Sequence, residues 1–184
     1  MKKEHTELRR RPLLTPVWLT AMAALLVVVL ATWFLSSLTT TTVVVVRHAE
    51  KELGTIEDPP LSQAGEQRAQ LLARMFGERE GPGRIDAIFA SDTRRAQRTA
   101  APLADRLGIA VTTVGGKDVD GLLHRIRAHH GGRVVVVGHS NTVPEIVGRL
   151  TGARVPPIAD DDYSQMYVIT IPTLGPASLL SASY

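Results

Sequence analysis

Two histidines in this chain stand just after runs of four valines, and their types and spacing suit phosphate chemistry. His48 follows Val43–Val46 with Arg47 between them, and His139 stands two residues after Val134–Val137. A neutral imidazole can attack phosphorus, and an arginine fork binds phosphoryl oxygens. A fold that brings these three side chains together would therefore suit binding and transfer of a phosphoryl group.

The two valine runs also predict the elements that position these side chains. Each run is short, continuous and β-branched, which is typical of a strand buried on both faces of a parallel sheet. Ligands of such sheets bind at the carboxyl ends of the strands, so we expect both histidines at one edge. Gly138 permits a close approach of the backbone there, and residues 140–142 begin a helix whose N–H groups favour an anion.

A third segment carries arginines to the same edge. Residues 86–90 are predicted as a strand and residues 93–107 as the helix that follows it, with Arg94, Arg95 and Arg98 near the helix start. These arginines are spread around the helix, so only one or two of them can point into a site.

The remaining segments alternate in the same way. Further strands are predicted at 41–47, 110–114, 133–138 and 165–171, an edge strand at 177–183, and helices at 62–76, 118–130 and 142–151. Alternation of this kind predicts an α/β fold in three layers, a mostly parallel sheet with helices on both faces. Residues 40–184 are enough for one domain of this kind.

The N-terminal segment predicts a membrane helix. No charged residue occurs from Pro12 through Val46, and residues 17–35 are mostly apolar. As a helix they would be about 28 Å long, close to the hydrocarbon thickness of a bilayer. A cleaved signal peptide usually has a shorter apolar core of about 7 to 15 residues. We therefore expect a transmembrane anchor over 17–36, with a cleaved signal peptide or a buried core helix as the alternatives.

The charges predict the orientation of this anchor. Residues 1–16 hold five basic and two acidic residues, whereas the rest of the chain holds 16 of each. A basic flank stays in the cytoplasm, so we expect a cytoplasmic tail at 1–16, a single pass through the cytoplasmic membrane and residues 40–184 on the extracytoplasmic side. The balanced charge of the domain argues against nucleic acid as a partner. The absence of cysteine excludes disulfides and thiolate chemistry.

Four stretches resemble the motifs of the histidine phosphatase superfamily, the phosphoglycerate-mutase-like clan. They resemble, in chain order, the family's Arg-His-Gly, Leu-Thr-x-x-Gly, Ser-x-x-x-Arg-Ala-x-x-Thr-Ala and Gly-His motifs. In this sequence they read Arg47-His48-Ala49, Leu61-Ser62-Gln63-Ala64-Gly65, Ser91 through Ala100, and Gly138-His139. The resemblance covers almost all of 40–184, and its third motif selects Arg95 over Arg94 and Arg98. Alanine replaces the family's glycine at position 49.

The resemblance implies a role for each of these residues. His48 would attack phosphorus and become transiently phosphorylated, while Arg47, Arg95 and His139 clamp the phosphoryl oxygens. Water would then release phosphate, and no metal or other cofactor is implied. Asn141 is either a helix cap or a further substrate ligand.

The expected activity is that of a membrane-anchored phosphatase. Its substrate would be a small phosphomonoester or a phosphorylated protein side chain, bound in a pocket without a large cap domain. Two alternatives are a phosphate-binding pseudo-phosphatase tethered to the membrane and a phosphotransferase of the phosphoglycerate mutase type. A mutase would need additional groups for a second anionic part of its substrate, and the sequence has no insertion that would supply them.

The sequence gives weaker evidence for a catalytic or binding role of the other polar residues. The acid that protonates the leaving group is left open among Asp118, Asp120 and Glu50, or none of them; a good leaving group, as in phosphohistidine or an acyl phosphate, needs less acid help. The three histidines His124, His129 and His130 do not share a helix face, so we expect surface residues and no metal. Residues 160–162 are expected as a solvated acidic loop, and Lys51 on a surface loop.

Overall fold

The computed structural model describes residues 17–37, 39–54, 57–78, 80–81 and 83–184. The chain divides into two compact units, residues 1–37 and 38–184. In the first unit the described element is α1 (Val17–Ser37). Its segment Val17–Leu35 has a mean hydropathy of 2.3 and no buried residue, and it is long and apolar enough to cross a membrane. A membrane span and a signal sequence both fit this helix, and the predicted basic tail lies outside the described residues.

The second unit is built on one sheet of six strands, in the order β3-β2-β4-β1-β5-β6. The strands are β1 (Thr40–Arg47), β2 (Ala87–Ser91), β3 (Val111–Val114), β4 (Arg133–Gly138), β5 (Gln165–Pro172) and β6 (Ser178–Ser183). The first four run parallel, whereas β5 pairs antiparallel with β1 and β6 pairs antiparallel with β5. The predicted α/β fold with a mostly parallel sheet is confirmed. The antiparallel strands β5 and β6 form one edge of the sheet.

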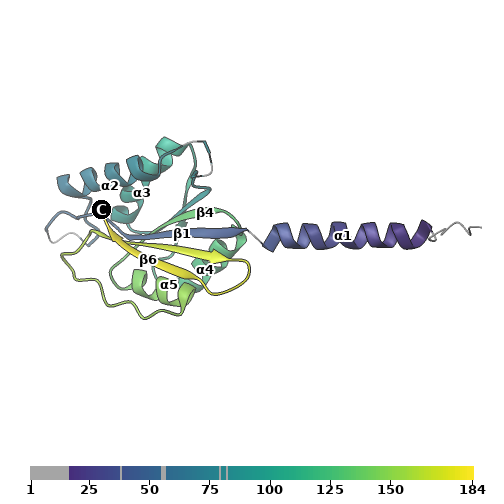
Figure 1. Ribbon diagram of the computed structural model, residues 1–184. Helices are drawn as coiled ribbons and strands as arrows, with labels where there is room; N and C mark the ends of the chain where they lie inside the picture. Colours follow the sequence, from purple (N-terminus) through teal and green to yellow (C-terminus); the bar gives the residue numbers. More distant parts are fainter. Residues whose placement is uncertain (1–16, 38, 55–56, 79, 82) are drawn as a thin grey trace, which may run out of the picture. The chain divides into compact units, whose positions relative to one another are not determined.

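Four helices cover the two faces of this sheet (Figure 1). They are α2 (Gln63–Phe76) and α3 (Arg94–Leu107) on one face, and α4 (Val119–Ala128) and α5 (Thr142–Thr151) on the other. Three of the predicted helices agree with these bounds to within a residue. The fourth, α4, ends two residues earlier than expected, because Gly131 with a φ of 76° and the bond from the Gly132 N–H to the His129 carbonyl turn the chain there.

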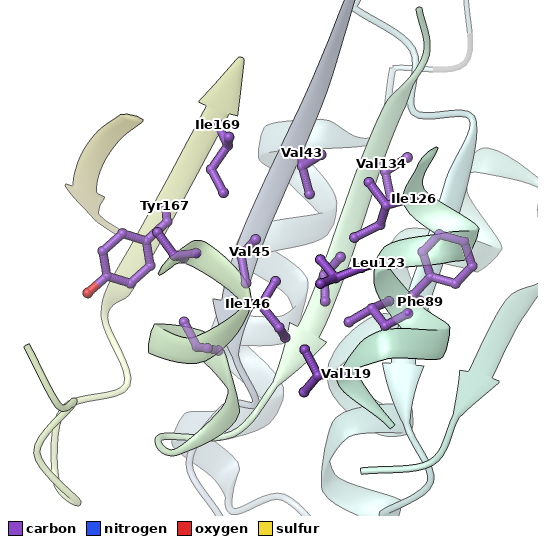
Figure 2. Close-up of a cluster of buried hydrophobic side chains, with 14 of the residues drawn as sticks. Val43, Val45, Phe89, Val119, Leu123, Ile126, Val134, Ile146, Tyr167 and Ile169 are labelled. Atoms are coloured by element: carbon purple, nitrogen blue, oxygen red, sulfur yellow. The ribbon is translucent and has the colours of Figure 1, made fainter. Parts of the chain in front are cut away.

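The valines alternate between the two cores, which is why both central strands are apolar throughout. Val44 and Val46 pack with α2 and α3, while Val43 and Val45 pack with α4 and α5. Figure 2 shows the core between the sheet and the helices α4 and α5, in which side chains from the strands meet Val119, Leu123, Ile126 and Ile146. Each buried valine contributes roughly 1.5–3 kcal/mol relative to an exposed one, so the strands that carry the histidines are firmly held.

Candidate active site

The strand register brings the two histidines to one edge. Arg47 lies opposite Gly138 at the ends of β1 and β4, and the main-chain N–H of His48 donates to the Gly138 carbonyl over 2.8 Å. The imidazoles of His48 and His139 follow directly, and their ring centroids are 5.2 Å apart. The two residues that the valine runs single out are therefore neighbours at the carboxyl edge of the sheet.

The His48 imidazole is buried and has a defined tautomer. Its Nδ1 lies 2.8 Å from the Ala49 carbonyl oxygen. A carbonyl can only accept, so Nδ1 carries the proton. The Nε2 atom is then a lone pair, and it accepts a hydrogen bond from Arg95 Nε over 3.2 Å. Burial lowers the pKa of His48 to about 3, with smaller contributions from His139 and the nearby arginines, and the bond to Ala49 opposes the shift. The ring is therefore neutral near pH 7.

Arg95 reaches the site from the first turn of α3, and a loop residue orients it. Its Nη1 pairs with the Asp58 carboxylate at 3.0 Å, and the other Asp58 oxygen accepts from the main-chain N–H of Arg94 over 2.8 Å. Arg94 and Arg98 are exposed, as expected. Sequence reasoning missed Asp58 because it stands 37 residues before Arg95, and no local pattern indicates such a contact.

Arg47 is held from the other side of the site by the loop after α5. Only 4% of the residue is exposed. Its Nη1 donates to the carbonyl oxygens of Ala159 at 2.7 Å and Asp162 at 2.9 Å, and its guanidinium lies 4.1 Å from the Tyr163 ring centroid. Its Nε is buried and has no partner within the described part of the chain. One donor of this arginine is thus buried without an acceptor among those residues.

His139 has different surroundings from His48. Its Nε2 lies 2.7 Å from the Ser91 hydroxyl at the end of β2, and its main-chain N–H donates to the Thr142 hydroxyl. Burial lowers the pKa of His139, and the Arg95 charge adds to this effect. The preceding Gly138 is closely packed, because a Cβ there would lie 3.0 Å from the Thr142 hydroxyl. His139 is therefore fixed mainly by side-chain hydroxyls and by the start of α5.

A cleft opens above these groups at the edge of the sheet. It is lined by the four residues predicted to bind and transfer phosphate, Arg47, His48, Arg95 and His139. Its other lining residues are Asn141, Lys51, Asp92, Thr93, Gly115, Gly116, Lys117, Asp118, Ser140 and Asp160. Asn141 makes no side-chain cap bond to α5, so its amide is available to a ligand. Lys51 was expected on a surface loop, and it is exposed but also belongs to this rim.

Of the three acids considered for proton donation, Asp118 lines the cleft, and its carboxylate also caps α4 by accepting from the Gly121 N–H. Asp120 pairs with Arg149, and Glu50 forms a forked pair with Arg68; neither belongs to the cleft lining. Asp92 lines the cleft and accepts from the Gly116 N–H, and sequence reasoning missed it. No group of histidines and carboxylates suited to a metal ion occurs among the residues that the structure describes.

The family model for the histidine phosphatase superfamily, branch 1, matches residues 43–116. That range holds the first three motifs, and the fourth stands beside them in the structure. This match covers 74 of the 184 residues and marks this part of the chain as similar to the histidine phosphatase superfamily. None of the curated proteins matches the chain in sequence.

Solved structures of several phosphatases share the fold. The protein histidine phosphatase SixA complexed with tungstate is 21% identical, with a TM-score of 0.64, and the match covers 77% of this chain and 96% of that one. A phosphoserine phosphatase from Entamoeba histolytica in complex with 3-phosphoglyceric acid is 16% identical, with a TM-score of 0.59 and coverages of 78% and 97%. A mycobacterial glucosyl-3-phosphoglycerate phosphatase is 18% identical, with a TM-score of 0.55 and coverages of 71% and 90%.

Two of the superfamily motifs support the segment after β1, residues 48–51, which we call the nucleophile loop after the role that the resemblance implies for His48. Gly65 packs so closely on it that a Cβ would lie 2.1 Å from the Glu50 carbonyl oxygen. The Thr99 hydroxyl donates to the Arg95 carbonyl over 2.7 Å and accepts from the Ala49 N–H over 2.9 Å. The glycine of the second motif and the threonine of the third are therefore scaffold positions around His48.

Proposed function

We propose that this chain is a phosphatase that transfers the phosphoryl group of its substrate to His48 and then to water. The observation that carries the proposal is the state of His48: a neutral imidazole whose unprotonated Nε2 receives a hydrogen bond from Arg95, with His139 beside it. A nucleophile of this kind needs no base to remove its proton before it attacks.

The first step forms a bond between Nε2 of His48 and phosphorus while the bond to the leaving group breaks. The incoming phosphoryl oxygen takes over the Arg95 Nε–H that Nε2 accepts in the free site. Arg47 and the His139 imidazole line the same cleft and complete the set of donors around the phosphoryl group. These donors stabilise the charge on the phosphoryl oxygens as it passes through the transition state.

In the second step water attacks the phosphohistidine and the P–N bond breaks. One proton of the water stays on the phosphate that leaves, and the other passes to solvent. His48 returns to its starting tautomer with Nδ1 still bonded to Ala49. The Ala49 carbonyl favours phosphorylation at Nε2, because it keeps the proton on Nδ1 through both steps.

The acids of the cleft favour a substrate with a good leaving group. Asp118 caps α4 and Asp92 accepts from the Gly116 N–H, so two of the three cleft carboxylates already serve as acceptors in the free site. The third, Asp160, is exposed. A leaving group that departs without a proton, as in phosphohistidine or an acyl phosphate, suits such a site better than an alkyl ester. We infer that a phosphorylated protein side chain or an activated small phosphate is the substrate.

We propose a place for the domain from α1 and from the charges of the N-terminal segment. We infer that residues 17–36 anchor the chain uncleaved in the cytoplasmic membrane, with the basic residues 1–16 in the cytoplasm and residues 40–184 outside it. Protease added to right-side-out membrane vesicles should digest the domain. Protection in these vesicles, together with digestion in inverted ones, would overturn this orientation.

The test of the activity uses the full chain in detergent micelles. Phosphate release from p-nitrophenyl phosphate and from acetyl phosphate is measured for the wild type and for His48→Ala, and the phosphoenzyme is trapped with labelled substrate. We expect release that depends on His48, and label that is lost in acid and kept in alkali. Vanadate binding without release of phosphate would instead favour the tethered binding module.

A further inference from the structure

We propose that Arg68 is a positioning residue for the site. It holds the nucleophile loop through Glu50, and it reaches Arg47 through Tyr184, the residue that follows β6. The proposal rests on the function proposed above. Arg68 is on α2, outside the cleft, and contacts no reacting group. Its contacts nevertheless lead to both the nucleophile loop and Arg47.

The first branch runs from Arg68 to the nucleophile loop. Its Nε donates to both Glu50 oxygens at 3.0 Å, and its Nη2 donates to one of them at 2.7 Å. This fork holds Glu50, which stands two residues after His48 and one after the carbonyl that fixes the His48 tautomer. The side chains of the pair are 21% and 23% exposed, so solvent screens them less than an open surface pair.

The second branch runs from Arg68 through Tyr184 to Arg47. The Nη1 of Arg68 donates to the main-chain oxygen of Tyr184, and its guanidinium lies 5.4 Å from the Tyr184 ring centroid. The Tyr184 N–H donates to the Ser164 carbonyl over 3.1 Å. Both the N–H and the hydroxyl of Ser164 donate to the Asp162 carboxylate, and the Asp162 carbonyl accepts from Arg47.

The two branches make Arg68 a shared support of the nucleophile and the anion clamp. All five donors of a guanidinium lie in one plane, so Arg68 can bind Glu50 and Tyr184 at once only in one orientation. Without it the nucleophile loop keeps the contacts of Ser62 and Thr99 but loses its hold on the Glu50 side chain. Small displacements of a nucleophile are costly, because attack requires contact distance and alignment.

A second ion pair on the same helix serves as the matched control. Glu66 of α2 pairs with Arg98 of α3 at 2.8 Å, and these side chains are 39% and 54% exposed. Neither residue belongs to the cleft or touches the nucleophile loop in any contact recorded for the described residues. Arg98→Gln therefore removes an arginine–glutamate pair from α2 and leaves the support of the site in place.

The experiment compares Arg68→Gln, Arg68→Lys and Arg98→Gln with the wild type, as full chains in detergent micelles. We expect Arg68→Gln to lower kcat for p-nitrophenyl phosphate about tenfold with a smaller change in KM, because the nucleophile is displaced more than the clamp. Arg68→Lys should recover part of the loss, since an ammonium can hold Glu50 but cannot also reach Tyr184 in the same plane. Arg98→Gln should match the wild type.

A second measurement reads the position of His48 without turnover. In chains labelled with ¹⁵N-histidine, the Nδ1–H signal of His48, assigned by its absence in His48→Ala, should weaken or shift in Arg68→Gln and remain in Arg98→Gln. An unchanged kcat and an unchanged Nδ1–H signal in Arg68→Gln would overturn the positioning role. If the wild type shows no turnover that depends on His48, the proposed function fails and the Nδ1–H signal alone decides the role of Arg68.

Two further variants keep the test decisive. If Arg68→Gln does not fold, Glu50→Gln removes the charge of the pair while it keeps an amide oxygen as acceptor, and it should lower kcat in the same direction. Tyr184→Phe should have no effect on kcat. The Tyr184 hydroxyl is buried without a partner among the described residues, and the hydrogen bond from Arg68 to Tyr184 goes to the Tyr184 main chain. A loss in Tyr184→Phe equal to that in Arg68→Gln would contradict the second branch, which uses only the main chain of Tyr184.

Discussion

The ends of β1 and β4 are alike in sequence and different in their surroundings. Each strand has four valines and delivers a histidine to the same edge of the sheet. His48 is 4% exposed, and a main-chain carbonyl fixes its proton on Nδ1, which leaves Nε2 as a lone pair. His139 is less buried, and its Nε2 contacts a serine hydroxyl that can either donate or accept.

This difference suits the separate roles that we propose for the two histidines. A carbonyl permits one tautomer, which is what a nucleophile requires, whereas a hydroxyl permits both, which suits a group that adjusts to a bound anion. On the proposed function, two similar strand ends thus supply a nucleophile and a binding group, and the atoms that distinguish them are the Ala49 carbonyl and the Ser91 hydroxyl. Substitutions at and around the two histidines test this contrast.

The largest effect is expected at His48. His48→Gln should lower kcat by at least about 1000-fold, because the attacking atom is removed. The His139→Gln variant described next is the internal comparison, so both variants are measured with p-nitrophenyl phosphate under one set of conditions. Residual activity in His48→Gln comparable to that of the His139 variant would remove the distinction between nucleophile and binding group.

A smaller loss is expected at His139. His139→Gln should lower kcat/KM about 100-fold, since one donor to the developing charge is lost while the nucleophile remains. Phosphoenzyme should still form, more slowly, and vanadate should bind more weakly than to the wild type. Trapping of the phosphoenzyme together with a vanadate titration checks both points, and complete absence of phosphoenzyme would contradict the assignment.

The burial of His48 should also appear in the pH dependence of stability. Its pKa is lowered from 6.5 to about 3 in the folded chain. Between these values the unfolded chain binds a proton that the folded chain does not, so the free energy of unfolding falls as the pH falls. One proton corresponds to about 1.4 kcal/mol per pH unit. His48→Gln should therefore lose less stability than the wild type on acidification from pH 6.5 toward pH 3 in denaturant titrations; identical slopes would contradict this.

Asp58 should have a moderate effect through Arg95. Asp58→Asn keeps the shape of the side chain but removes the charge that holds the Arg95 Nη1. We expect kcat/KM to fall about tenfold, because Arg95 is less well oriented toward the phosphoryl group. Glu66→Gln, which breaks the exposed pair with Arg98, is the control and should match the wild type.

The smallest effect is expected at Ser91. Ser91→Ala removes one hydrogen bond to His139 and should change kcat/KM about threefold, in line with the net value of a single neutral hydrogen bond. A loss as large as that of His139→Gln would mean that Ser91 itself acts on the substrate, and the contrast between the two strand ends would need revision.

Much of this arrangement could be predicted from the sequence because it depends on local patterns. The valine runs predict the central strands, and Gly77, Gly108 and Gly131 end the helices near the expected places. The edge of a parallel sheet then gathers the side chains that follow the strands, so Arg47, His48 and His139 could be placed together from their positions alone.

The missed features depend on contacts between distant parts of the chain. Asp58 reaches Arg95 across 37 residues, and the Ala159 and Asp162 carbonyls reach Arg47 across 112 and 115 residues. Local periodicity carries no information on such pairs. Local periodicity could not predict the direction of β5 either, since an apolar strand has the same pattern whether it runs parallel or antiparallel to β1.

The contact between Gly65 and the Glu50 carbonyl has a consequence for how this sequence can vary. Even one methyl group at position 65 would collide with main-chain atoms at 2.1 Å, and main chain cannot rotate out of the way as a side chain can. In a saturation screen, position 65 should therefore tolerate no replacement, although it is remote from the cleft rim. An intolerant glycine of this kind would be mistaken for a substrate contact if tolerance were taken as a map of binding.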